Sequence, residues 1–333
     1  MKRICALLCL LAMLLMAGCT GLGAQKTGAF APDDKNRLVI CTSHKKEVYE
    51  PIIREFEQRT GIWVELETGG TTALLSRIAA GEISCDLMLG GGIDSLQAYS
   101  DCFSEYVSPN AEGVLPAYRS ADGSYSPFSA LPIVLIYNTK LVRVNPPTGW
   151  ESLIDEAWKG KIAFADPEVS GSSYTSLCTM IQAIGGDSGE LLKAFSDNLD
   201  GRLLADSGDV VSAVADGRCY IGVTLEETAL KAIASGYDMA IVYPSEGTSA
   251  LPDGAAVIAG CEHRENAEMF IDFLLCQDMQ EFLQDKLYRR SVCKTDMPAM
   301  AELELIDYDL EWASGTREEL MSRWDELMGG ARA

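Results

Sequence analysis

Loops rich in hydroxyl groups and glycines follow several apolar segments of this sequence. The loops that could do chemistry are Ser43-His44, Thr71-Thr72, Gly90-Gly91-Gly92 and Ser170-Gly171-Ser172-Ser173. Each lies close to the predicted start of a helix, where backbone N–H groups have no partner within the helix. Such a helix end has roughly half a unit of positive charge and favours anions. The repeated pattern predicts a site for a small oxyanion.

The same loops have a simpler interpretation as helix caps. A Ser or Thr before a helix stabilises it by about 1 kcal/mol without any ligand. Thr224 with Glu227, and Thr316 with Glu319, fit the capping box, in which both side chains serve the helix itself. The loop from Ser170 to Ser173 goes beyond this interpretation, because it has three hydroxyls and a glycine where one cap needs a single oxygen.

Catalytic signatures are scarce in the sequence. The chain has two histidines, His44 and His263. His263 lies in a charged stretch and is expected to be solvated, so only His44 could complete a Ser/His/Asp triad or a Cys/His pair. The GxSxG elbow, the HExxH motif, the EF-hand loop and the P-loop do not occur, and the cysteines lack zinc spacing. We expect no enzyme activity, no cofactor and no metal site.

Length and charge narrow the class of protein. The 333 residues suggest about two globular domains. The net charge of -22 makes nucleic acid or an anionic bilayer a poor partner for most of the surface. A small anion is still possible, because backbone N–H groups bind it through local dipoles.

The first nineteen residues are expected to be an export signal. A short cationic start is followed by an uncharged apolar run, residues 4–18, that is too short for a comfortable membrane span. The run ends in Ala17-Gly18-Cys19, which resembles the lipobox of bacterial lipoproteins, where the cysteine is acylated. Residues 20–36 would then be a tether. We expect the protein outside the cytoplasm, attached to the cell membrane only through a lipid on Cys19.

Cysteines beyond the export segment show no CxxC motif and no paired spacing. Most lie in apolar stretches, which favours small buried hydrophobic side chains. One or two disulfides are possible in an exported protein, and the sequence leaves their pairing open. These cysteines are Cys41, Cys85, Cys102, Cys178, Cys219, Cys261, Cys276 and Cys293.

The elements that position the loops alternate between strand and helix. Strands are expected at 37–42, 62–66 and 86–89, with helices between them, in the rhythm of a parallel doubly wound sheet. The rhythm repeats from residue 131. The further strands are expected at 131–137, 161–165, 219–223, 239–243 and 255–258, and helices at 172–184, 209–216, 225–235, 269–275 and 279–287. We expect an α/β fold with a cleft between two such sheets.

Several motifs together resemble the extracellular solute-binding proteins of ABC importers. They include Tyr137-Asn-Thr-Lys-Leu, Pro147-Thr-Gly-Trp-Glu-Ser-Leu, Trp158-Lys-Gly-Lys-Ile-Ala-Phe-Ala-Asp-Pro and Tyr243-Pro-Ser-Glu-Gly-Thr. The resemblance is strongest to the branch that binds ferric iron, phosphonates and sugar phosphates. It implies a type II periplasmic-binding fold with two α/β lobes joined by a hinge. The first lobe would comprise 37–130 and 245–333, and the second lobe 131–244.

The resemblance also implies a ligand. Ferric binders of this branch usually offer adjacent tyrosines, whereas the segment after Gly222 reads Val-Thr-Leu-Glu-Glu. Organophosphate and phosphonate binders offer hydroxyls and N–H groups at helix starts, as here. His44 could then contact the phosphoryl group, and Glu226 or Glu227 a hydroxyl or amine of the ligand. The implied contacts are Ser43, His44, Thr71, Thr72, Gly91, Gly92, Ser170, Gly171, Ser172, Ser173, Glu226 and Glu227.

The predicted function is therefore capture of a small organophosphate, phosphonate or sugar phosphate and its delivery to an ABC permease, by a monomeric protein. A ferric-iron-binding protein of an importer is the main alternative. A polyamine binder and a secreted hydrolase using His44 are further alternatives. The identity of the solute and of the permease stays open.

Overall fold

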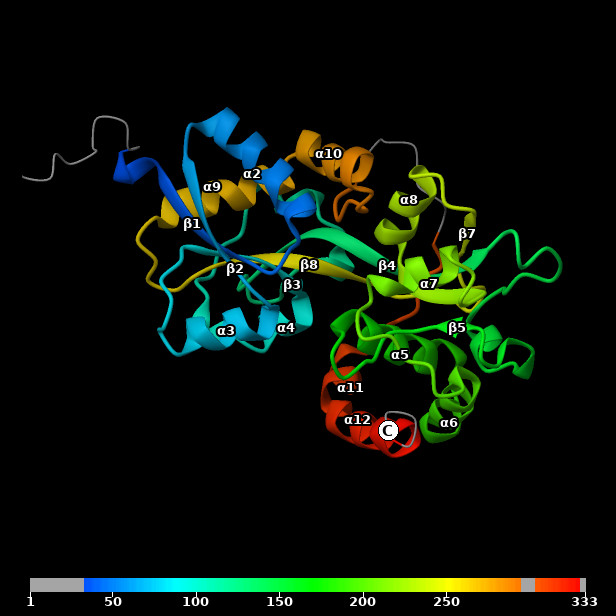
Figure 1. Cartoon of the computed structure of the whole chain (residues 1–333). Helices are drawn as coiled ribbons and strands as arrows, with labels where there is room; N and C mark the ends of the chain where they lie inside the picture. The colour runs from blue at the N-terminus through cyan, green and yellow to red at the C-terminus, as the bar shows by residue number, and fades with distance from the viewer. Residues whose placement is uncertain (1–32, 295–302, 330–333) are drawn as a thin grey trace, which may run out of the picture.

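A computed structural model of the chain describes residues 33–294 and 303–329 (Figure 1). The predicted export signal 1–19, with Cys19, lies outside the described residues, as does most of the predicted tether 20–36. In the part that is described, no helix is both long and apolar enough to cross a membrane.

The first lobe begins with the predicted strand and helix alternation. Strand β1 (Arg37–Thr42) pairs in parallel with β2 (Trp63–Thr68) and with β3 (Leu87–Gly92). Helix α2 (Lys46–Thr60) ends where Gly61 adopts the left-handed conformation, with φ of 71°. Helix α3 (Thr71–Ala79) leads to β3, whose last residues are the glycine run, and the short α4 (Ile93–Gln97) follows.

One long strand joins the two lobes. The first half of β4 (Ser126–Asn138) pairs antiparallel with β8 (Ala250–Val257), and its second half with β6 (Ile221–Leu225) and β7 (Met239–Val242). Strand β8 also pairs antiparallel with β3, and β5 (Ile162–Ala163) pairs in parallel with β6. The strand order is β2-β1-β3-β8-β4-β6-β5, with β7 beside β4. The predicted parallel sheets are therefore mixed sheets, connected through β4 (Figure 1).

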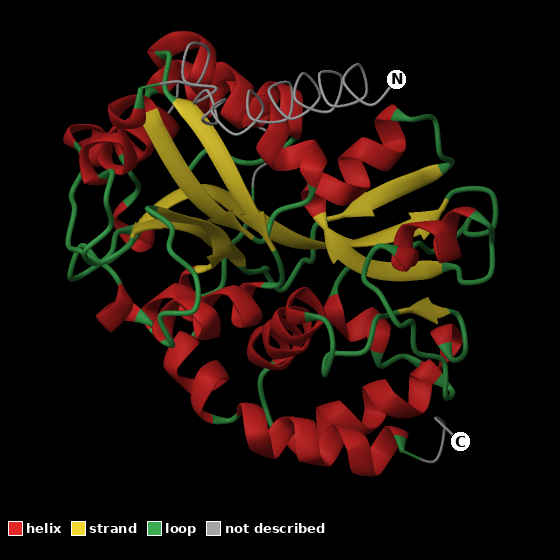
Figure 2. Cartoon of the chain, turned by 60° about the vertical axis from the view of Figure 1, so that its left-hand side comes forward, coloured by secondary structure: helices red, strands yellow, loops and turns green. Residues whose placement is uncertain are grey.

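Helices cover both sides of this path of strands (Figure 2). In the first lobe, α9 (Arg264–Leu275) and α10 (Gln277–Leu287) pack with α2 over a core that includes Phe56, Phe128 and Phe270. The second lobe contains α5 (Gly171–Ile184), α6 (Ser188–Leu199), α7 (Asp209–Ala215) and α8 (Glu226–Ala234). Helix α6 is absent from the sequence-based expectation.

The last two helices pack on the second lobe, whereas the sequence analysis assigned all of 245–333 to the first. Helices α11 (Leu310–Gly315) and α12 (Arg317–Met328) lie beside α5 and α6 (Figure 1). Trp324 of α12 is fully buried against Phe164 and Phe195, with ring centroids 6.1 and 6.0 Å away. Burial of this large aromatic surface fixes the helix on that lobe.

Both predicted capping boxes are wrong. Thr224 continues β6, so Leu225 takes the N-cap position of α8. The Thr316 hydroxyl donates to the carbonyl oxygen of Trp312, 2.7 Å away, rather than accepting from the start of α12. The expected cap residue therefore belongs to the preceding strand in the first case and bonds to the preceding helix in the second.

Candidate functional site

The carboxyl ends of β1 and β3 hold the first predicted loop in place. The Thr42 hydroxyl donates to the carbonyl oxygen of Leu89 at 2.9 Å and accepts from the His44 N–H at 3.2 Å. A methyl group added to Gly90 would lie 2.9 Å from Ser43 Oγ and from the His44 ring, and Gly90 has a φ of +101°. Residue 90 must therefore be glycine for Ser43 and His44 to lie where they do.

The next glycine lies against the start of α3. A methyl group added to Gly91, where φ is +88°, would lie 2.7 Å from Thr71 Cγ2. Thr71 and Thr72 open α3 after Gly70, and no side chain in the described ranges caps this helix. Gly92 pairs with Asp253 across β3 and β8. The structure thus brings together the strand ends of the first lobe that the sequence analysis selected, with Ser43 and His44 beside Gly90 and Thr71 beside Gly91.

His44 is the most unusual of these residues. Its side chain is only 8% exposed, and its ring meets Phe128 edge-on with centroids 5.5 Å apart. The Nε2 atom lies 3.6 Å from Asp253 Oδ2, and it has no hydrogen-bond partner among the described residues. Burial, together with the positive charge of Arg289, lowers the pKa of His44 to about 3, so the imidazole is neutral at pH 7. A buried ring nitrogen without a partner is available to a ligand.

Arg289 connects Asp253 to the second lobe. It donates from Nη1 to Ser129 Oγ at 2.7 Å and to Asp253 Oδ2 at 2.8 Å. Its Nε lies 3.0 Å from Glu227 Oε2, and all of these side chains are nearly buried. Burial raises the pKa of Asp253, an effect that the neighbouring Arg289 opposes.

Arg290 forms a second bridge beside the first. Its Nε and Nη2 each donate to one carboxylate oxygen of Glu226 at 2.7 Å, and the Tyr243 hydroxyl donates to the same carboxylate at 2.7 Å. Glu226 is fully buried. Burial and Glu226 raise the pKa of Tyr243. Both arginines follow α10 of the first lobe and both glutamates open α8, so these ion pairs join the lobes.

Sequence reasoning missed Arg289, Arg290 and Asp253. The chain contains a single Arg-Arg pair, at 289–290, and this pair was the available signal. An anion site made of hydroxyls and backbone N–H groups does not require an arginine, so the pair by itself does not indicate the site. Glu226 and Glu227 have arginine partners in the structure, and their predicted contact with a ligand stays a prediction.

The predicted loop of the second lobe largely satisfies its own hydroxyls. Ser170 Oγ accepts from the Ser173 N–H at 3.3 Å and from Ser173 Oγ at 3.0 Å, and it lies 3.1 Å from Ser172 Oγ. Ser170 is therefore the N-cap of α5, as the simpler interpretation proposes. A Cβ atom added to Gly171 would meet nothing within 4 Å, so the space beside this helix start is open.

One further contact brings the lobes together near these loops. A Cβ atom added to Gly208, at the start of α7, would lie 3.7 Å from Lys45 Nζ, which belongs to the first lobe. The loop after β1 therefore lies opposite a second-lobe helix start.

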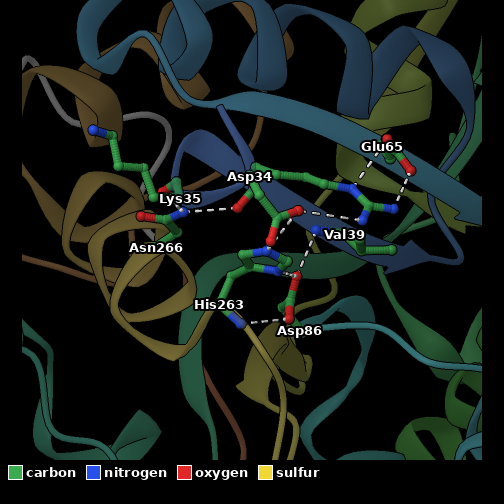
Figure 3. Close-up of polar contacts among 8 residues, drawn as sticks. Asp34, Lys35, Val39, Glu65, Asp86, His263 and Asn266 are labelled. Atoms are coloured by element: carbon green, nitrogen blue, oxygen red, sulfur yellow. Dashed lines mark hydrogen bonds and ion pairs between the residues drawn. The ribbon is translucent and has the colours of Figure 1, made fainter. Parts of the chain in front are cut away.

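A second polar cluster occupies the opposite end of β1 and β3, where Figure 3 shows His263 between the carboxylates of Asp34 and Asp86. Asp86 and His263 also line a cavity of about 510 Å³. The side chain of His263 is 7% exposed, so the expectation of a solvated residue is wrong. Its Nδ1 lies 3.0 Å from Asp86 Oδ2, and Asp86 also accepts from the N–H groups of Val39 and His263 at 2.7 and 2.9 Å. In the ranges 33–294 and 303–329, no group of three or more His, Cys, Asp or Glu side chains could hold a metal ion.

Comparison with known proteins shows which fold and family this geometry belongs to. The periplasmic binding protein AfuA of Actinobacillus pleuropneumoniae, with exogenous fructose-6-phosphate bound, superposes with a TM-score of 0.76 at 24% identity, over 88% of this chain and 98% of that chain. The apo ferric ion-binding protein A of Pasteurella haemolytica has a TM-score of 0.78 at 17% identity, with 88% and 98% coverage. These likenesses establish the two-lobe periplasmic-binding fold.

Sequence relatives point to the same class of protein. Iron uptake protein A1 of Synechocystis sp. is 27% identical over 285 residues, which cover 79% of this chain and 78% of the relative. A Salmonella paratyphi A relative named "Putative 2-aminoethylphosphonate-binding periplasmic protein" is 23% identical over 295 residues, with 84% and 83% coverage. Residues 38–289 match the family described as bacterial extracellular solute-binding protein. The chain therefore belongs to this family and is an extracytoplasmic solute-binding protein of an ABC importer, with a small-molecule ligand and a permease as partners.

Proposed function

We propose that the solute is a small organophosphate, phosphonate or sugar phosphate, held where the loops after β1 and β3 face the second lobe. The observation that supports this most directly is the neutral, buried imidazole of His44, whose Nε2 has no hydrogen-bond partner among the described residues. A neutral imidazole can donate one N–H to a phosphoryl oxygen. An anion beside Nε2 would accept this hydrogen bond and give the buried nitrogen a partner.

The charges around His44 indicate how such an anion is held. Arg289 and Arg290 are already paired with Glu227 and Glu226, so the arginines add little net positive charge. The remaining donors are the N–H groups that open α3 and α5 and the hydroxyls of Ser43, Thr71, Thr72, Ser172 and Ser173. Several donors of this kind compensate the loss of water around a phosphoryl group. Contacts from both lobes would favour the conformation in which the lobes are together.

A ferric-iron cargo is the second candidate, and the names of relatives such as iron uptake protein A1 favour it. Hard Fe(III) prefers anionic oxygen ligands, and phenolates are the ones this branch usually offers. The Tyr243 hydroxyl donates a hydrogen bond to Glu226, and its raised pKa disfavours the phenolate. We therefore place the organophosphate ahead of iron.

A thermal-shift screen followed by calorimetry tests the proposal on the chain without residues 1–19. The panel is fructose-6-phosphate, 2-aminoethylphosphonate, inorganic phosphate, sulfate, ferric citrate, spermidine and a chromogenic phosphate ester. A phosphoryl compound should raise the melting temperature and give a saturable titration, because a ligand that binds only the folded state stabilises it. A visible charge-transfer band with ferric citrate alone would establish iron, and turnover of the ester that is lost in His44→Ala would establish a hydrolase.

The second-lobe loop is tested by the double variant Ser172→Ala with Ser173→Ala. We expect affinity for the phosphoryl compound to fall by about tenfold or more, because two donors at the start of α5 are removed. Ser314→Ala is the matched control, since its hydroxyl donates only to helix carbonyls in α11. Unchanged affinity in the double variant would remove Ser170 to Ser173 from the site.

We also propose that Cys19 is acylated and that one copy of the chain binds one solute. Labelling with a radioactive fatty acid should be lost in Cys19→Ser. Light scattering of the purified protein should give the mass of a monomer.

A further inference from the structure

Two cysteines of the first lobe lie in direct contact. Cys41 is in β1, and Cys85 lies just before β3. Their sulfur atoms are 2.6 Å apart, well inside the distance at which unbonded sulfur atoms sit. Both residues are buried, with 0% and 4% of their surface exposed. Among the cysteines of the described ranges, this is the pair whose sulfur atoms touch.

Backbone contacts fix the approach of the two residues. The Asp86 N–H donates to the Val39 carbonyl oxygen at 2.7 Å, and the Val39 N–H donates to the Asp86 carboxylate at 2.7 Å. The strands pair with Cys41 opposite Met88. Both cysteines belong to a small apolar cluster that includes Leu74, Leu75 and Leu96. Cys85 precedes the residue opposite Cys41 by three positions, so the two side chains meet diagonally between the strands.

We propose that Cys41 and Cys85 form a disulfide in the exported protein, joining β1 to the start of β3. The location outside the cytoplasm provides the oxidising environment in which such bonds form and persist. The pair lies directly before the loops that hold Ser43, His44 and the glycine run. A bond between the sulfurs would fix the relative position of these two loops.

The oxidant is an external disulfide, either that of a thiol–disulfide oxidoreductase or a small-molecule disulfide. While the chain folds, one cysteine thiolate attacks a sulfur of the external disulfide, which gives a mixed disulfide and releases one external thiol. The second cysteine then attacks the mixed disulfide at the protein sulfur and releases the second external thiol. Two electrons pass from the protein sulfurs to the external disulfide, and two external thiols are formed for one Cys41–Cys85 bond.

In the folded protein, the hydrogen bond with Cys85 lowers the pKa of Cys41. The same bond, with burial, raises the pKa of Cys85. Once formed, the bond would be almost fully buried, with Cys85 at the wall of the cavity beside Asp86.

Peptide mapping of the full-length chain, purified from an exporting bacterial host, tests the proposal. The protein is unfolded without reductant, free thiols are alkylated, and the digest is analysed by mass spectrometry. We expect one cross-linked species joining the peptides of Cys41 and Cys85, two hydrogens lighter than the sum of the free peptides. Alkylation of both residues, or a bond from either to another cysteine, would overturn the proposal.

Melting temperatures give a second, independent readout. Dithiothreitol added to unfolded wild-type protein before refolding should lower the melting temperature by about 5 °C or more, because an open loop from 41 to 85 gains conformational freedom in the unfolded state. The double variant Cys41→Ala with Cys85→Ala should show no shift with dithiothreitol, and the partly exposed Cys102→Ser should keep the wild-type shift. An equal melting temperature of oxidised and reduced wild-type protein would contradict the proposal. None of these outcomes depends on which solute the protein binds.

Discussion

The two histidines occupy opposite ends of the same strands and are buried to nearly the same degree, yet their surroundings differ. His263, at the amino ends of β1 and β3, bonds to Asp86, and Asp86 also accepts two backbone N–H groups. His44, at the carboxyl ends, lies 3.6 Å from Asp253, whose carboxylate is bonded to Arg289 instead. At the amino end, His263 has hydrogen-bond partners within the protein. At the carboxyl end, the buried Nε2 of His44 has no hydrogen-bond partner among the described residues.

This difference separates a structural role from a binding role. A satisfied buried pair contributes to stability and has nothing left for a ligand. An unsatisfied buried atom costs stability unless a ligand completes it. We expect substitutions at the His263 end to change unfolding, and substitutions at the His44 end to change binding.

The largest effect is expected for Asp86→Ala. The substitution leaves the N–H groups of Val39 and His263 and the ring of His263 without their acceptor, and removal of a buried charged partner costs about 3 to 5 kcal/mol. Urea unfolding measures the loss. Affinity of the folded protein for its solute should stay within about twofold. A loss below about 1 kcal/mol would show that the amino end of the sheet is not a structural cluster.

His44→Ala should have the opposite profile. Removal of the imidazole eliminates one hydrogen bond to the anion, about 2 kcal/mol, so affinity should fall by about thirtyfold. Calorimetry with the best phosphoryl compound measures this change. His263→Asn is the matched control and should keep wild-type affinity while losing stability. Equal affinity of His44→Ala and wild type would move the binding site elsewhere.

Acid should destabilise the ligand-free protein partly through His44. The pKa is about 3 in the folded protein and about 6.5 for an ordinary histidine, so between these values the unfolded chain binds the extra proton. Stability from this residue is complete above pH 6.5 and is lost as the pH falls towards 3. When the pH falls from 6.5 to 5, His44 should lower the free energy of unfolding of the wild type by about 1.5 kcal/mol. The variant His44→Asn should lack this contribution, so its free energy of unfolding should fall by that much less. Urea midpoints across this range measure it, and parallel curves for the two proteins would contradict it.

The smallest effect is expected for Arg290→Lys. Lysine cannot make the two parallel hydrogen bonds that Arg290 makes to Glu226, so unfolding free energy should fall by about 1 kcal/mol. The exposed pair of Arg323 with Glu326 supplies the control, since Arg323→Lys should change stability by only a few tenths of a kcal/mol. A similar small change in the free energy of unfolding at both positions would show that the Arg290–Glu226 ion pair adds little to stability.

The sequence predicts the first lobe better than the connection between the lobes. The strand at 37–42 and the helix expected between it and the strand at 62–66 agree with the structure, because local periodicity defines them. The antiparallel pairing of β4 with β8 was not foreseen, since the paired residues are more than a hundred positions apart. The packing of α12 on the second lobe depends on Trp324 finding Phe164 and Phe195, which no local pattern indicates.

The sequence also predicts the candidate site only in part. Loops after β1 and β3 converge because parallel neighbouring strands end at the same edge of a sheet. The ion pairs could not be read from the sequence, because Arg289 and Arg290 meet Glu227 and Glu226 only after α10 packs on the first lobe. A run of hydroxyls is a local pattern in the sequence, whereas the partner of an arginine that lies far away in the chain is not.

The continuity of β4 limits how the two halves of the molecule can move. Ser126–Pro132 is hydrogen-bonded into one sheet and Ile133–Asn138 into the other, with the Ile133 N–H donating to Ser249 at 3.1 Å. Sliding one half past the other would break rungs of both ladders at once, whereas a change of a few backbone torsions near Pro132 would disturb only the hydrogen bonds next to it. Solute capture in this protein is therefore expected as a rotation about a point inside a strand, with the amides on either side of Pro132 exchanging slowly with deuterium throughout the cycle.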